Sequence, residues 1–164
     1  MDEFGPMELR PQAGRSFQPH GLAHRQRATY TRRHGVRQLL AAYDVATGQI
    51  WGLFRRRKRA VEFLQLLKAI RRHYTGRIHI VLDNLSAHKT PEVLAWARRN
   101  NIRFAWLPTD ASWLNRIECQ FTHLKKNVLT HCDYISFDHM RRAIHRYLAW
   151  YSRQKARRLK LKRH

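Results

Sequence analysis

Cysteine is scarce in this sequence, and long apolar segments are absent from it. The chain has two cysteines among 164 residues and no CxxC pair. This excludes a disulfide framework and, with no leader pattern at the start, predicts a protein that is not secreted. No run approaches the roughly 18 consecutive apolar residues that a transmembrane helix requires. We therefore expect no membrane partner.

Acidic residues are also scarce. Lys and Arg number 33 against 11 Asp and Glu, which gives a formal net charge of +22, and the basic residues are spread along the whole chain. Repulsion at this charge density destabilises a compact state, so the composition predicts a polyanionic partner, and nucleic acid rather than a membrane surface. A solvated basic surface without a partner is the alternative.

Apolar residues make up 43% of the chain, which is sufficient for a core, and the length predicts one domain. Apolar periodicity predicts a hairpin followed by helices that alternate with single strands. The expected elements are strands at 39–43 and 50–54, a helix at 60–74, a strand at 78–82, a helix at 90–100, a strand at 102–106, and helices at 115–128 and 136–151. This order predicts an α/β fold with a parallel part of the sheet covered by helices and an antiparallel edge.

The first 36 residues fit this pattern less well. Asp2 and Glu3 have no strand before them, and Gly5-Pro6 directly behind them is a turn signal. Residues 7–36 contain few periodic apolar residues and are rich in Arg, His, Gln and Gly, which predicts irregular or edge structure.

Two acids lie at the ends of predicted elements. Asp83 directly follows the apolar strand 78–82, which places it at a rim of the sheet. Glu118 lies one turn into the helix that we expect to begin at Asn115. Carboxylates that are far apart in sequence but meet at element ends suit a site for a hard divalent cation such as Mg²⁺.

Each acid also has a purely structural interpretation. Asn115 and Glu118 have nearly the spacing of a capping box, in which Glu118 only satisfies a backbone donor. Asp83 could be a turn former at the end of its strand, and Asp2 an unordered acid near a terminus.

A zinc site is a further alternative. Cys119 and His123 have the i, i+4 spacing of one helix face, and His131 and Cys132 follow them. Two nitrogen and two sulfur ligands are a common set for tetrahedral zinc, although short side chains on one helix rarely close a tetrahedron with an adjacent pair.

Several ordered motifs resemble the catalytic core of DDE transposases from insertion sequences related to the Tc/mariner superfamily. The resemblance covers nearly the whole chain, and Asp83 and Glu118 are separated by 34 residues, which is typical of this branch. The motifs are Asp2-Glu3-Phe4-Gly5-Pro6, the turn ending at Gly48, Val81-Leu82-Asp83-Asn84 with His88-Lys89, Leu107-Pro108, Leu114-Asn115, and Ile117-Glu118 with Lys125 downstream.

The resemblance implies a ribonuclease-H-like α/β catalytic domain, with a mixed sheet flanked by helices as in retroviral integrases. It implies that Asp2, Asp83 and Glu118 hold two Mg²⁺ or Mn²⁺ ions and catalyse phosphodiester cleavage and strand transfer in DNA transposition. Two metals can activate the attacking oxygen and stabilise the leaving oxygen of an in-line displacement. The implied partners are double-stranded transposon ends and target DNA, and a homodimer is an expected assembly.

The resemblance also suggests which basic residues contact DNA. His88, Lys89, Lys125 and Lys126 are the predicted nucleic-acid-binding residues, because Lys and Arg neutralise phosphates. We expect residues 1–152 to form the catalytic domain and residues 153–164 a basic C-terminal tail. The expected location is cytoplasmic and associated with the nucleoid.

The start of the chain departs from the family pattern. In the family a strand precedes the first acid and lies in the middle of the sheet, whereas no such strand precedes Asp2, so we expect the first strand to be missing. Either the true start lies upstream, or the chain is a truncated copy or one half of an interrupted reading frame. Two other functions follow from this departure. They are a catalytically inactive, basic DNA-binding remnant and a ribonuclease-H-like nuclease without a role in transposition.

Overall fold

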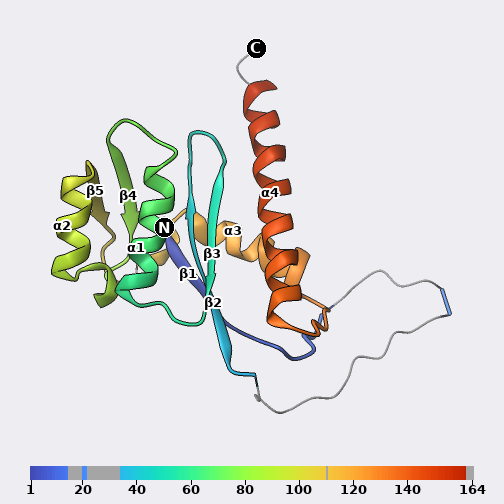
Figure 1. Ribbon diagram of the computed structural model, residues 1–164. Helices are drawn as coiled ribbons and strands as arrows, with labels where there is room; N and C mark the ends of the chain where they lie inside the picture. Colours follow the sequence, from blue (N-terminus) through green and yellow to red (C-terminus); the bar gives the residue numbers. More distant parts are fainter. Residues whose placement is uncertain (15–19, 22–33, 110, 162–164) are drawn as a thin grey trace.

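The computed structural model describes residues 1–14, 20–21, 34–109 and 111–161 (Figure 1). The strands are β1 (Asp2–Glu8), β2 (Val36–Tyr43), β3 (Ile50–Arg55), β4 (Ile78–Leu82) and β5 (Ile102–Trp106). The helices are α1 (Ala60–Arg71), α2 (Pro91–Arg99), α3 (Ile117–Leu124) and α4 (Phe137–Leu161), with 3₁₀ turns at Ser86–His88 and Ser112–Leu114 and a π-helical turn at Lys125–Leu129. In this part of the chain, every helix is too short or too polar to cross a bilayer.

The strands form two sheets that meet at the first residue. β1, β2 and β3 form an antiparallel sheet in that order, and β4 and β5 form a parallel pair. The Met1 ammonium group donates a hydrogen bond of 2.7 Å to the carbonyl oxygen of Val81 on β4. Met1 therefore connects the start of β1 to the free edge of β4.

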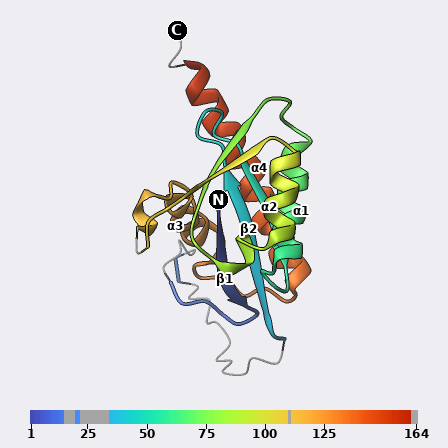
Figure 2. The same cartoon turned by 90° about the vertical axis from the view of Figure 1, so that its left-hand side faces the viewer.

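Helices cover both faces of this arrangement (Figure 2). α1 and α2 lie on one side and α3 on the other, so the domain has three layers. The alternation of β2 divides the core between the two faces, because successive side chains of a strand point in opposite directions. Leu40 packs in the cluster beneath α1, whereas Leu39 and Ala41 pack in the cluster beneath α3 and α4.

The predicted hairpin, the alternation of helices with strands and the bounds of β4 and β5 are confirmed. The start of α2 is confirmed in detail, because the Thr90 hydroxyl accepts a hydrogen bond of 3.4 Å from the Val93 amide and Pro91 lies in the first turn.

The expectation of a missing first strand is wrong for the residues from Asp2 onward. Asp2 is the first residue of β1, which pairs with β2 in the register Asp2 opposite Ala41 and Phe4 opposite Leu39. Gly5 and Pro6 lie inside the strand, at an irregularity between Phe4 and Met7 where the register shifts. A bulge tolerates proline because a ladder hydrogen bond is already interrupted there. The apparent turn signal is therefore a bulge.

Other boundaries differ from the predictions. α3 begins at Ile117 rather than at Asn115. α4 continues without interruption through residues 153–161, which we expected to form a separate tail, and residues 162–164 lie outside the described residues. Of residues 7–36, the segments 15–19 and 22–33 also lie outside the described residues, while residues 7 and 8 belong to β1.

The turn between β2 and β3 makes a specific stability prediction. Gly48 has a φ of +76°, and a Cβ atom there would lie 2.6 Å from Cβ of Lys155 on α4. Gly48→Ala is therefore expected to lower the free energy of unfolding by about 1–2 kcal/mol, through both backbone strain and the clash. Chemical denaturation measures this. Gly76→Ala is the matched control, since a Cβ atom at Gly76 meets nothing within 4 Å, and an equal loss in both variants would contradict the argument.

Candidate active site

The first acid is held by a buried asparagine. Asn115 is 3% exposed, and its side-chain amide donates hydrogen bonds of 3.0 Å to the Met1 carbonyl oxygen and 3.1 Å to Oδ2 of Asp2. The other carboxylate oxygen of Asp2, Oδ1, accepts a hydrogen bond of 2.7 Å from the Glu3 amide. Asn115 thus acts as a tertiary contact to Asp2 rather than as the predicted start of α3.

Asp2 and Glu118 form an interacting pair of carboxyl groups. The pKa of Asp2 is raised to about 7, mainly by burial and further by the hydrogen bond and negative charge of Glu118, against the lowering effect of the Glu3 amide. Glu118 lies in the first turn of α3. Two adjacent carboxyl groups repel each other when both are ionised, and a bound cation would offset this repulsion.

Asp83 lies directly after β4 and is half exposed, with 49% of its side chain accessible. Its Oδ1 atom accepts a hydrogen bond of 3.2 Å from the Leu85 amide. The negative charges of Asp2, Glu3 and Asp83 all act on the Met1 ammonium group, whose pKa is nevertheless lowered to about 6 by burial. The structure therefore places Asp2 beside Glu118, and Asp83 within electrostatic reach of Met1 at the start of β1.

His88, a predicted DNA-binding residue, is buried in the structure. Its side chain is 1% exposed, and Nε2 lies 2.8 Å from Oε1 of Glu3 while Nδ1 lies 3.1 Å from Oδ1 of Asp83. The second contact has an ion-pair distance without the alignment of a hydrogen bond. The ring is enclosed and both of its nitrogens face carboxylates, and the predicted DNA contact of His88 stays a prediction.

The three predicted DNA-binding lysines are exposed. Lys89 lies beside His88 in the chain, and its ammonium group is 5.1 Å from the centre of the Trp106 ring. Lys125 and Lys126 follow α3 in the π-helical turn. Their DNA contact stays a prediction. Lys125 directly follows α3, the helix that holds Glu118.

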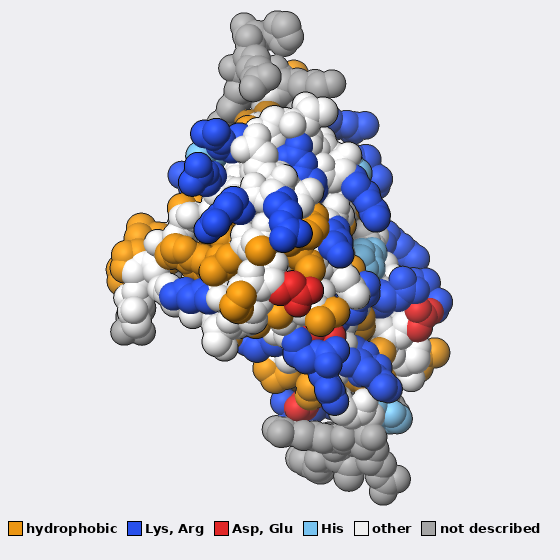
Figure 3. Space-filling model, turned by 60° about the vertical axis from the view of Figure 1, so that its left-hand side comes forward, with side chains coloured by type: hydrophobic (Ala, Val, Ile, Leu, Met, Phe, Trp, Pro, Cys, Tyr) orange, Lys and Arg blue, Asp and Glu red, His pale blue; other side chains and the backbone are white. Residues whose placement is uncertain are grey.

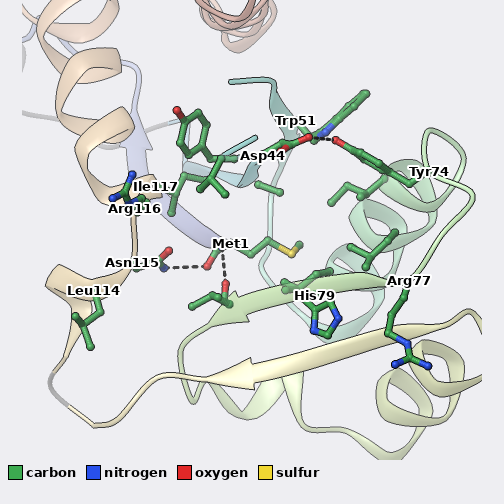
Figure 4. Close-up of a pocket in the computed structure, with 17 residues that line it drawn as sticks. Met1, Asp44, Trp51, Tyr74, Arg77, His79, Leu114, Asn115, Arg116 and Ile117 are labelled. Atoms are coloured by element: carbon green, nitrogen blue, oxygen red, sulfur yellow. Dashed lines mark hydrogen bonds between the residues drawn. The ribbon is translucent and has the colours of Figure 1, made fainter. Parts of the chain in front are cut away.

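Two hollows flank the acids. One, of about 310 Å³, lies between the hairpin and β4, with Met1 and Asn115 on its wall and Asp44 bonded to Tyr74 at its far end (Figure 4). The other, of about 470 Å³, lies between β1 and α3 and is lined by both Glu118 and Lys125. The second hollow places the predicted acid Glu118 and the predicted DNA-binding residue Lys125 on its wall.

The metal set remains a prediction. In the described ranges, His, Cys, Asp and Glu side chains form no group of three or more arranged to hold a metal ion. This also gives no support to a zinc site at Cys119, His123, His131 and Cys132, of which Cys119 is an exposed free thiol. The chemistry of the acids still fits Mg²⁺ or Mn²⁺, because both are hard cations that take carboxylate oxygens and Asp2 and Glu118 already interact.

Sequence reasoning missed two residues of the site. Glu3 was noted only as the neighbour of Asp2, although the alternation of a strand puts it on the opposite face, where it meets His88 and, at 3.9 Å, Lys58. Asn115 was assigned to helix capping, and its bond to Asp2 joins residues 113 positions apart. A strand assignment for residues 2–8 would have revealed the first, but no local signal points to the second.

The raised pKa of Asp2 predicts how stability depends on pH without metal. Because the folded protein holds a proton on Asp2 that the unfolded chain releases near pH 4, the free energy of unfolding should fall as pH rises from 4 to 7. Asp2→Asn should remove this loss and be more stable than the unsubstituted protein at pH 8 by roughly 1–2 kcal/mol, after allowing for solvent screening. The difference between the two proteins, measured by urea unfolding in chelator, separates Asp2 from the Met1 amine. Equal stabilities at pH 8 would contradict the prediction.

Comparison with known families gives the class of protein. A family model described as DDE superfamily endonuclease matches residues 1–141. Since the match covers most of the chain, including Asp2, Asp83 and Glu118, the chain belongs to the DDE superfamily of endonucleases. A sequence search of curated proteins found no match.

Solved structures with a similar fold are more specific. The Mos1 transposase paired-end complex matches with a TM-score of 0.67 and 15% identity, over 97% of this chain and 52% of that one. The Mos1 strand transfer complex matches with a TM-score of 0.67 and 13% identity, over 98% and 50%. The HTLV-2 integrase catalytic core with magnesium matches with a TM-score of 0.50 and 16% identity, over 70% and 77%.

These matches confirm the predicted ribonuclease-H-like, integrase-like fold. They also show that the chain spans about half the length of the matched Mos1 transposase chains.

Proposed function

We propose that this chain is the catalytic domain of a DNA transposase of the Tc/mariner-related type, which cleaves phosphodiester bonds and transfers DNA strands with a divalent metal. The observation that carries the proposal is the contact between Asp2 and Glu118, with Asp83 at the end of β4, in a chain matched to DDE endonucleases over residues 1–141. Carboxylates that lie near one another repel when ionised, and a bound cation would compensate for this repulsion.

Duplex DNA is the proposed partner because of the charge of the surface. Lys and Arg side chains cover much of the face shown in Figure 3, with only a few Asp and Glu side chains between them. The formal net charge is +22. The similar Mos1 paired-end complex contains a left transposon end, which supports transposon-end DNA as the substrate. The homodimer suggested by the family resemblance is part of the proposal and can be tested by light scattering.

Asp2, Asp83 and Glu118 would hold the metal ions. When bound, the ions supply Lewis-acid activation of the attacking oxygen and stabilisation of the leaving oxygen. The chain itself positions the acids: Asn115 holds Asp2 through Oδ2, and the Leu85 amide holds Asp83 through Oδ1. Lys125, beside Glu118 in the second hollow, would neutralise a phosphate of the bound DNA.

Metal-dependent nicking tests the proposal. The 164-residue chain is incubated with supercoiled plasmid and Mg²⁺ or Mn²⁺, and nicked circles are measured against a reaction containing excess chelator. We expect nicking with either ion and none with chelator. Cleavage that persists in chelator would contradict the proposed chemistry.

One observation favours a second function, a DNA-binding chain without cleavage activity. The described acids are not arranged as a complete metal site. The same reaction separates the two functions, because the second predicts duplex binding but no nicking with either ion.

A further inference from the structure

His88 is enclosed by three elements. Its ring packs against Phe63 of α1, with the ring centres 4.1 Å apart, and its Nε2 atom is 2.8 Å from Oε1 of Glu3 on β1. The ring itself belongs to the 3₁₀ turn Ser86–His88, which follows Asp83. The Glu3 side chain is 6% exposed. The imidazole is therefore fixed in orientation by the tilted Phe63 ring and a buried carboxylate.

The other ring nitrogen faces the site. Nδ1 of His88 lies 3.1 Å from Oδ1 of Asp83, the same oxygen that accepts the Leu85 amide. Nε2 is hydrogen-bonded to Glu3, whereas the contact of Nδ1 with Asp83 has the distance of an ion pair without the alignment of a hydrogen bond. The Asp83 side chain is half exposed, and the Leu85 amide and Nδ1 of His88 both lie against its Oδ1 atom. His88 is thus the link between a buried acid and an accessible acid.

A histidine packed in a core commonly has no role beyond filling space and satisfying its own nitrogens. Two facts separate His88 from that case. Both ring nitrogens face carboxylates rather than backbone carbonyl groups, and one of these carboxylates belongs to the candidate metal site. Charged groups next to a metal ligand restrict its orientation and change its affinity for metal.

We propose that His88, anchored by Glu3, is a positioning residue that holds the carboxylate of Asp83 through Oδ1 and leaves Oδ2 to bind the metal. This inference rests on the proposed function, since it assigns a metal to Asp83. It replaces a DNA-contacting role for His88 with a role behind the metal ligand. His88 touches neither substrate nor metal in this assignment.

His88→Phe is the main test, because phenylalanine retains a ring to pack on Phe63 and removes both nitrogens. Manganese binding by the full 164-residue chain is measured from the electron paramagnetic resonance signal of free Mn²⁺. We expect about a tenfold weaker affinity, as is typical when a group supporting a metal ligand is lost. Nicking by the variant should recover at high Mn²⁺ concentration, because the acids remain. A change that only damaged the fold would not be rescued by metal.

His79→Phe is the matched control, since His79 is an exposed histidine on β4, and its affinity for Mn²⁺ should stay within about twofold. If His88→Phe does not fold, as judged by thermal melting, His88→Gln decides, because its amide can replace one nitrogen; severalfold weaker binding is expected. Unchanged affinity in the folded His88 variant would overturn the proposal, provided that Asp83→Asn does weaken binding.

The failure of the proposed function would look different. In that case the unsubstituted chain would bind Mn²⁺ no more tightly than Asp83→Asn does. The positioning role is then judged without metal, from crystal structures of the unsubstituted protein and the folded His88 variant. A changed side-chain conformation of Asp83 in the variant would support it, and an unchanged conformation would overturn it.

Discussion

Asp83→Asn and Glu118→Gln are each expected to lower metal-dependent nicking by roughly 10³-fold or more, while leaving DNA affinity unchanged. Each amide keeps the shape of the carboxyl group and its hydrogen-bonding reach but removes the negative charge that would hold a metal. Metal ions at the reacting phosphate supply several kcal/mol of stabilisation to the transition state, so their loss falls on the chemical step. Nicking rates with Mn²⁺ and anisotropy with a labelled duplex measure the two quantities.

Glu92→Gln is the matched control, because Glu92 is an exposed acid in the first turn of α2 and is not one of the proposed metal ligands. Its nicking rate should stay within about twofold. Asp2→Asn should behave like the other two site variants, since Asp2 interacts with Glu118. If Glu118→Gln nicks as fast as the unsubstituted chain, Glu118 has only a structural role in the first turn of α3.

Affinity for duplex DNA is expected to fall by about 10³-fold or more when the salt concentration rises from roughly 50 to 200 mM. The reason is that a protein that neutralises six or more phosphates releases a counterion from each one. A formal charge of +22, with basic residues spread over the surface, provides enough cations for such contacts. Fluorescence anisotropy over a salt series gives the slope of log affinity against log salt concentration.

Two comparisons sharpen this experiment. Lys125→Ala with Lys126→Ala should lower the slope by about 2, since each exposed lysine is assigned one phosphate. A terminal-repeat duplex and a scrambled duplex should bind with similar affinity, because phosphate contacts carry no sequence information. Strong discrimination between the duplexes, or affinity that is insensitive to salt, would contradict phosphate-dominated binding.

Local patterns were sufficient to predict most of the fold. The β2–β3 hairpin, β4 and β5 follow from apolar strand runs, and the start of α2 follows from Thr90 and Pro91. β1 could not be predicted in this way. A bulge at Gly5-Pro6 and a turn at Gly5-Pro6 look alike in sequence, and only pairing with β2 distinguishes them.

Local patterns also predicted part of the site. Asp83 and Glu118 could be selected because they lie at element ends and match a family motif. The burial of His88 could not be predicted, because it depends on Phe63 from α1 and Glu3 from β1, which are distant in sequence. Residues that touch a partner across the fold carry no periodic signal of that contact.

The junction of the two sheets at Met1 has a mechanical consequence. Asp2 belongs to the antiparallel sheet and Asp83 to the parallel pair, and the two sheets meet where Met1 bonds to Val81. The spacing between these acids is therefore not fixed by a continuous ladder of backbone hydrogen bonds. Any cation shared by Asp2 and Asp83 would form a bridge between the two sheets. Metal binding would then also restrict the motion of one sheet relative to the other.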